Sequence, residues 1–209
     1  MKKARVILIL LAGLTAASAA PFGTNYPLLG EYSDLALDEA RSVVYLANFT
    51  AGRIDVFSLA SKGLLPPIRV GINPSAIALS PDGRNLLILN FGSESLFMVN
   101  LDSRAVQTVA LPESTVPGTP NLPRAAAFGS DGAAIIITSS RVVKYDPATG
   151  QLTVPSGQCP ITVLGGLPVP QPTSPAEIVN ARLATSQDRN TIFAVGSLNL
   201  NLFFAFYFS

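Results

Sequence analysis

The sequence predicts an all-β protein, a β-propeller built from four-stranded antiparallel blades. Apolar runs and polar turns recur along the 209-residue chain, with a spacing of 42 residues where the pattern is clearest. No stretch after the first twenty residues has sustained helical periodicity. A four-stranded propeller blade occupies about 40–45 residues, so this repeat length favours a propeller over a β-sandwich.

The spacing is measured on the first two repeats. Leu37–Leu59 aligns without a gap on Leu79–Leu101, which gives the offset of 42 residues. In the second repeat, Asp82-Gly83 separates two apolar runs, and a tight reversal there needs a residue that tolerates positive φ. The run Leu86–Leu89 is apolar throughout, as expected for a strand whose sheet is covered on both faces by stacked blades.

The chain divides into a signal peptide (1–19), a lead-in segment (20–31) and the propeller repeats (32–209). Four blades are expected, at about 32–74, 75–123, 124–178 and 179–209, the last of them incomplete. Propellers usually close into rings of four to eight blades, and three and a half repeats do not close such a ring comfortably. We therefore expect the N-terminal part of a larger propeller, or a truncated or frame-shifted product. A four-bladed ring and an assembly of two half-rings are the alternatives.

Three short segments resemble the YVTN-type β-propeller repeat. Tyr45–Asn48 and Leu87–Asn90, each behind a Pro-Asp-Gly-like turn, look like the second strand of that repeat. Asn73–Ala78 looks like the beginning of its inner strand, and the resemblance extends over about Tyr32–Asp146. It implies the propeller fold. It implies no particular function, because surface proteins, binding proteins and enzymes all carry this repeat.

The first nineteen residues have the three regions of a secretory signal peptide. The basic residues Lys2, Lys3 and Arg5 precede the apolar core Val6–Leu14, and Ala17–Ala19 offers a cleavage site. The core is shorter than the ~20 residues that span a bilayer, so no membrane span is expected after cleavage. We expect a secreted or otherwise extracytoplasmic protein, in the periplasm or at the cell surface.

Composition excludes several classes of function. The chain has 14 basic and 13 acidic residues. Without the three basic residues of the signal peptide, 11 basic residues remain against 13 acidic ones, a net charge of about −2. Without a basic patch or run, nucleic acid is not an expected partner. The chain has no histidine, which excludes a Ser-His-Asp triad, a histidine-bound metal and an imidazole base for the lone Cys159. No Gly-rich phosphate loop is present. We therefore expect no catalytic residue, metal site or cofactor.

Polar residues recur at turns, where a structural role explains them. One aspartate recurs in each repeat, at Asp38, Asp82, Asp131 and Asp188. This recurrence suggests a metal site. An aspartate in a hairpin turn, however, hydrogen-bonds to its own nearby backbone, which explains these residues better. Asn48 and Asn90 end their strands at equivalent positions, either as turn residues or as the lining of a ligand face. Asn48 also begins an N-x-[ST] sequon, which matters only in a glycosylating host. The remaining charges at turns are interpreted as solvated, namely Arg53, Arg84 and Arg141.

Two Pro-containing segments interrupt the repeats, at Pro112–Pro123 and Pro155–Asn180. Propeller geometry places both on one face, together with the turns that follow Asn48 and Asn90. Insertions on one face often build a binding surface, and the alternative is that both are connections without function. The longer segment exceeds an ordinary connection and is therefore either functional or disordered.

Two functions are compatible with these features. The preferred one is a non-catalytic binding or interaction module whose ligand is an unknown protein, glycan or surface component. The alternative is part of a propeller enzyme, such as a lactonase-like hydrolase, whose catalytic residues lie in blades outside this sequence.

Overall fold

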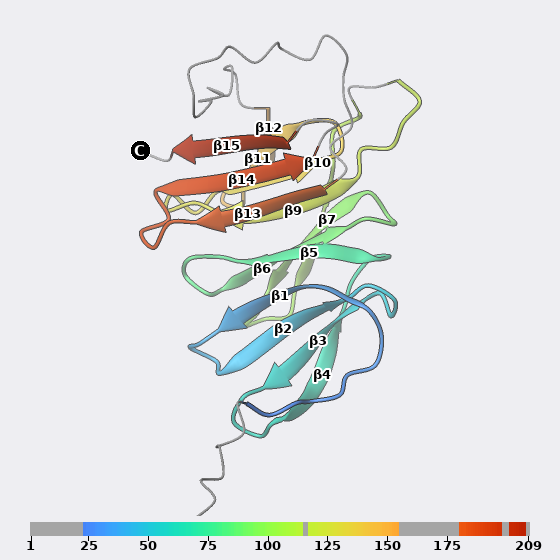
Figure 1. Ribbon diagram of the computed structural model, residues 1–209, viewed down its shortest axis with the longest axis vertical. Helices are drawn as coiled ribbons and strands as arrows, with labels where there is room; N and C mark the ends of the chain where they lie inside the picture. The colour runs from blue at the N-terminus through green and yellow to red at the C-terminus, as the bar shows by residue number, and fades with distance from the viewer. Residues whose placement is uncertain (1–22, 115–116, 155–179, 198–200, 208–209) are drawn as a thin grey trace, which may run out of the picture.

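The computed structural model describes residues 23–114, 117–154, 180–197 and 201–207, which form β-strands and turns. Within these ranges there is no helix, and so none long and apolar enough to cross a membrane. The strands form antiparallel sheets in which chain neighbours are hydrogen-bonded neighbours (Figure 1). The prediction of an all-β chain with four-stranded antiparallel blades is confirmed.

The first two sheets have four strands each. The first contains β1 (Tyr32–Asp38), β2 (Val43–Asn48), β3 (Arg53–Ser58) and β4 (Gly63–Arg69). The second contains β5 (Pro74–Leu79), β6 (Asn85–Asn90), β7 (Ser95–Asn100) and β8 (Val106–Ala110). The second sheet matches the strands expected from the 42-residue pattern.

The other two sheets follow the same order. The third contains β9 (Pro123–Phe128), β10 (Ala134–Thr138), β11 (Val142–Asp146) and β12 (Gln151–Thr153). The fourth has three strands among the described residues: β13 (Asn180–Thr185), β14 (Thr191–Ser197) and β15 (Asn201–Tyr207). Successive sheets lie side by side from the blue first sheet to the orange and red fourth sheet (Figure 1). The strands β1, β5, β9 and β13 contact one another in that order, and we call them the inner strands.

The hydrophobic core lies between successive sheets and explains why the central strands are apolar throughout. In β6, Leu86 and Ile88 pack toward the first sheet, whereas Leu87 and Leu89 pack toward the third. Successive side chains of a strand point to opposite faces, so a sheet covered on both sides needs apolar residues at every position. All four of these side chains are fully buried, as predicted from the sequence.

The tight turns between the first two strands of a sheet require left-handed backbone conformations. Gly83 and Gly132 have φ values of 67° and 80°, a region that glycine enters at no steric cost. The Asp-Gly pairs of the second and third repeats therefore form the reversals that the sequence predicts.

Candidate functional site

The inner strands of the first three sheets share a β-bulge near their beginning. Register shifts between Tyr32 and Asp34 in β1, and at the corresponding points of β5 and β9, leave one extra residue in each strand. These residues are Ser33, Ser75 and Arg124. A bulge bends its strand and re-aims the side chain that it carries. The fourth inner strand, β13, pairs without a register shift.

The two bulge serines tie one blade to the next. The Ser33 hydroxyl donates to the Pro74 carbonyl of the second sheet (2.6 Å), and the Ser75 hydroxyl donates to the Pro123 carbonyl of the third (3.0 Å). The same contact thus recurs at two successive blade junctions. Each hydroxyl proton is used within the fold, and the oxygen keeps lone pairs that can accept a further hydrogen bond.

The bulge residues line a cavity of about 610 Å³ to which all four inner strands contribute. Its wall includes Ser33 of β1, Ser75 of β5, Arg124 of β9 and Arg182 of β13. We call it the axial cavity, because it lies where the inner strands of the successive sheets come together. Its volume falls within the range of small-molecule sites, about 300–1,000 Å³.

Two phenylalanines from equivalent turns complete the wall. Phe49 follows β2 and Phe91 follows β6, and their ring centroids are 6.3 Å apart. Asn73 holds both turns, since its side-chain amide donates to the Phe49 carbonyl (3.1 Å) and its backbone carbonyl accepts from the Phe91 N–H (2.9 Å). The Arg124 guanidinium lies over the Phe91 ring, 5.1 Å from its centroid, in a cation–π contact.

The cavity wall carries two positive charges, Arg124 and Arg182, and the described lining contains no acidic side chain. The nearby Asp34 carboxylate is occupied by the backbone N–H groups of Leu35 and Ile77, both at 2.9 Å. Burial raises the pKa of the Asp34 carboxyl, and these hydrogen bonds together with Arg182 lower it again only in part.

A polar network at the end of β2 supports the cavity wall from behind. The Tyr32 hydroxyl donates to the buried Asp55 carboxylate (2.8 Å), and the buried Asn48 amide donates to the same oxygen (2.8 Å). Arg53 donates to the other Asp55 oxygen at 2.7 Å. Burial by itself raises the pKa of Asp55, but the hydrogen bonds from Asn48, Tyr32 and Arg53 outweigh it and hold the pKa below its usual value. Tyr32, which lines the axial cavity, is thereby fixed in place.

The strand-end asparagines have different surroundings. The Asn48 amide donates to the Leu29 carbonyl as well as to Asp55, and its oxygen accepts from the Ala51 N–H, as predicted for a turn residue. It is fully buried, so the sequon that it begins offers no accessible amide. The Asn90 amide is also fully buried, but neither its nitrogen nor its oxygen has a hydrogen-bond partner among the described residues.

The turn aspartates accept backbone hydrogen bonds close to their own positions. Asp82 accepts from Arg84 N–H and Asp188 from Asn190 N–H, both at 3.0 Å. Asp131 accepts from Ala133 N–H at 3.0 Å, and Asp38 accepts from Arg41 N–H three residues ahead. Across the described ranges, no three Asp, Glu or Cys side chains are grouped as they would be to hold one metal ion.

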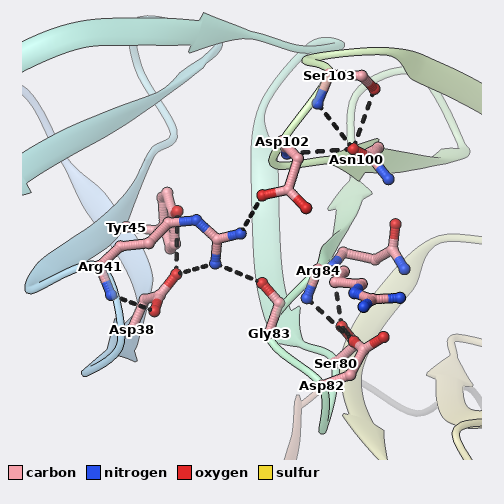
Figure 2. A network of polar contacts seen from close by, with 11 residues as sticks. Asp38, Arg41, Tyr45, Ser80, Asp82, Gly83, Arg84, Asn100, Asp102 and Ser103 are labelled. Carbon is pink, nitrogen blue, oxygen red and sulfur yellow. Dashed lines mark hydrogen bonds and ion pairs between the residues drawn. The ribbon is translucent and has the colours of Figure 1, made fainter.

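A second polar network lies on the opposite face, at the other end of these strands. Figure 2 shows Arg41 reaching from the first sheet to the second, where it donates to the Gly83 carbonyl (2.6 Å) and pairs with Asp102 (2.5 Å). It also pairs with the buried Asp38 at 2.9 Å. Hydrogen bonds therefore join the first two blades at both faces.

The first insertion packs on the turn that follows β10. Asn121 is buried and donates to the Pro112 carbonyl (2.7 Å), while Arg141 donates to the Glu113 carbonyl (2.6 Å). The Asn121 N–H also donates to Glu94 in the turn after β6, so this insertion lies on the face predicted for it. A smaller cavity of about 320 Å³ is lined mostly by residues of this insertion, together with Glu94.

The structure corrects one prediction and leaves others untested. Arg53 and Arg141 are not simply solvated charges, because Arg53 neutralises a buried carboxylate and Arg141 secures the first insertion. The expected signal peptide (1–19) and residues 155–179 of the second insertion, which include Cys159, lie outside the described residues.

Sequence reasoning missed the residues that line the axial cavity. A signal for them exists in the 42-residue offset, which superposes Ser33 on Ser75 and Phe49 on Phe91. The offset does not reveal that these residues face a common axis, because the bulges that turn them there are a feature of strand pairing. Arg124 and Arg182 carry no such signal.

Comparison with solved structures supports the propeller-like fold. The chain is similar to hydrazine synthase of Kuenenia stuttgartiensis, with a TM-score of 0.59 and 14% identity over 90% of this chain and 53% of that one. It is also similar to the extracellular domain of BT4673 from B. thetaiotaomicron, with a TM-score of 0.55 and 14% identity over 79% of this chain and 20% of that one. This chain therefore spans about half the length of the first and a fifth of the second. No protein-family model matches the sequence, and no curated protein matches it. At this identity the likenesses establish a β-propeller-like fold and nothing further about function.

Proposed function

We propose that this chain is an exported β-propeller module that binds its ligand in the axial cavity without catalysing a reaction. The observation that carries the proposal is the shared cavity itself. Four inner strands, three of them with a bulge at the same point, direct Ser33, Ser75, Arg124 and Arg182 to one place. Ligand sites are usually concave and combine apolar walls with a few convergent polar groups, and the axial cavity has both.

The proposed location is extracytoplasmic, which places the ligand among proteins, glycans and surface components outside the cytoplasm. The signal-like residues 1–19 support export, and one structural likeness is to an extracellular domain. We further propose that the chain belongs with the YVTN-type repeat proteins that it resembles.

The enzyme alternative makes a different demand on the chain. A lactonase-like hydrolase that uses this cavity would need an activating group, such as a metal ion held by carboxylates of this chain. Titration of the full chain with Ca²⁺ separates the two functions. Saturable binding at one site per chain would favour the hydrolase, whereas ligand capture that is independent of added metal ions would favour the binding module.

The proposal is tested by screening the purified full chain on glycan and protein arrays. The variant Phe49→Ala/Phe91→Ala removes the apolar wall of the cavity, and Leu64→Ala is the control because Leu64 is exposed on the outermost strand β4. We expect the native chain and the control to capture the same ligands and the double variant to lose them. A thermal melt checks that each variant folds, and Arg124→Gln serves as a second cavity variant. An array without any captured ligand, or capture that the cavity variants leave unchanged, would overturn the proposal.

A further inference from the structure

The two arginines of the axial cavity determine which group of a ligand can bind there. Arg124 and Arg182 come from the neighbouring inner strands β9 and β13, and both line the cavity. A guanidinium offers several N–H donors in a planar fork that matches a carboxylate, and such charge-assisted hydrogen bonds are stronger than neutral ones. The described lining has no acidic side chain, and Asp34 is not part of it. The cavity is therefore suited to an anion.

The bulge serines determine what else the ligand must carry. The hydroxyl protons of Ser33 and Ser75 are donated to the Pro74 and Pro123 carbonyls, so toward the cavity these oxygens act as acceptors. A ligand that pairs with them must supply donors, as hydroxyl groups do. Phosphate and simple carboxylates have no such donors when fully ionised.

The aromatic wall adds an apolar requirement. Phe49 and Phe91 are tilted by 50° to each other, and both are only partly buried. Faces of this kind pack against carbon-bound hydrogen atoms, such as those on one face of a saturated ring. A ligand for this cavity thus needs a carboxylate, several hydroxyl groups and a compact apolar face.

From these three requirements we infer that the axial cavity binds a small hydroxylated carboxylate of the sugar-acid class. The inference rests on the proposed function and specifies its ligand. Arg124 and Arg182 hold the carboxylate, the Ser33 and Ser75 oxygens accept from ring hydroxyls, and the phenylalanine wall, with Phe49, packs against the ring. A cavity of about 610 Å³ accommodates one or two such rings.

Isothermal titration of the full chain with digalacturonic acid tests this inference. Arg124→Gln and Arg182→Gln each remove one positive charge from the cavity, while Arg84→Gln removes one from the turn at the opposite end of the second blade. We expect each cavity variant to weaken binding about tenfold or more, the loss of a charge-assisted hydrogen bond. The control should change the affinity less than about twofold, because exposed charges on the far face are largely screened. Arg182 is exposed, so its variant is informative even where Arg124→Gln unfolds the chain.

Three further probes separate the neighbouring ligand classes. A neutral disaccharide of the same size should bind at least tenfold more weakly, and inorganic phosphate and a diglutamate peptide should compete poorly. Equal binding of the neutral sugar would overturn the sugar-acid class while leaving the axial cavity as a ligand site. If phosphate or the acidic peptide binds more tightly than digalacturonic acid, the sugar-acid inference is overturned in favour of a phosphate or an acidic-peptide ligand, respectively. A chain that binds none of the four probes but captures another ligand through the same cavity would overturn the inference and retain the proposed function.

Discussion

Asn48 and Asn90 lie 42 residues apart at equivalent strand ends, in the first and the second blade, and both are fully buried. Asn48 is surrounded by partners, whereas Asn90 has none among the described residues. The repeat offset explains the difference. The positions equivalent to Tyr32 and Asp55 hold Pro74 and Phe97 in the second blade, and neither side chain can hydrogen-bond an amide.

The comparison shows that an asparagine at the same repeat position has different surroundings in the two blades. In the first blade, the asparagine organises a buried polar network that also fixes a wall of the axial cavity. In the second blade the equivalent asparagine is present without this network, and no hydrogen bond among the described residues offsets the cost of burying its amide. Four predictions test this difference, in order of decreasing effect.

The largest effect is expected from replacing the asparagines themselves. Asn48→Leu removes the amide that bonds Asp55 and Leu29 and leaves the buried carboxylate with fewer donors, so it should lower the free energy of unfolding by about 3 kcal/mol. Asn90→Leu removes an amide that has no partner among the described residues and should change the free energy of unfolding by less than about 1 kcal/mol in either direction. Urea denaturation of the two variants measures both values. Equal losses would refute the difference between the blades.

Replacing the glycines that lie against these two amides should also destabilise the protein more in the first blade than in the second, by smaller amounts. A Cβ on Gly30, which has a φ of 106°, would come within 2.7 Å of the Asn48 side-chain oxygen. Gly30→Ala should cost about 2 kcal/mol, because the backbone is strained and Asn48 is held by its hydrogen bonds. A Cβ on Gly71 would come within 2.6 Å of the Ser93 hydroxyl and 2.8 Å of Asn90 Cγ.

Gly71→Ala should cost about 1 kcal/mol, since Asn90 has no hydrogen bond to lose among the described residues. Thermal melts of the two alanine variants against the native chain provide the comparison. A larger loss at Gly71 than at Gly30 would contradict it.

The pH dependence of stability should distinguish the blades as well. The folded-state pKa of Asp55 lies below its ordinary value of 3.8, so its contribution is complete above that value and is lost as the pH falls through the folded pKa. Asp55→Asn should therefore be destabilised at pH 7 and lose less further stability between pH 5 and pH 2.5 than the native chain does. Urea midpoints across that range measure the effect. Parallel profiles would show that Asp55 is not the titrating group.

The smallest effect is expected on the face shown in Figure 2, where the blades are joined through a partly exposed side chain. Arg41→Ala should cost about 1 kcal/mol, because exposed ion pairs contribute little even though Asp38 is buried. The loss should shrink in 0.5 M salt, where charge interactions are screened. A loss that is as large as that of Asn48→Leu would place the main junction of the two blades on this face.

The repeats, the turns and the apolar strands could be predicted from the sequence because they depend on local rules. The 42-residue offset identified the blades, Asp82-Gly83 identified a reversal that needs positive φ, and Leu86–Leu89 identified a strand buried on both faces. A period and a turn are encoded within a few residues of one another, so a single sequence is sufficient to recognise them.

The candidate site was decided by the tertiary structure. Ser33, Ser75 and Arg124 share a cavity because three strands carry a bulge at the same point, and a bulge depends on the register between strands. Arg182 joins them from a strand nearly sixty residues further along the chain. The different surroundings of Asn48 and Asn90 likewise depend on which side chains the neighbouring strands bring to them. Local pattern determines the blade, whereas the site depends on contacts between blades that no local pattern records.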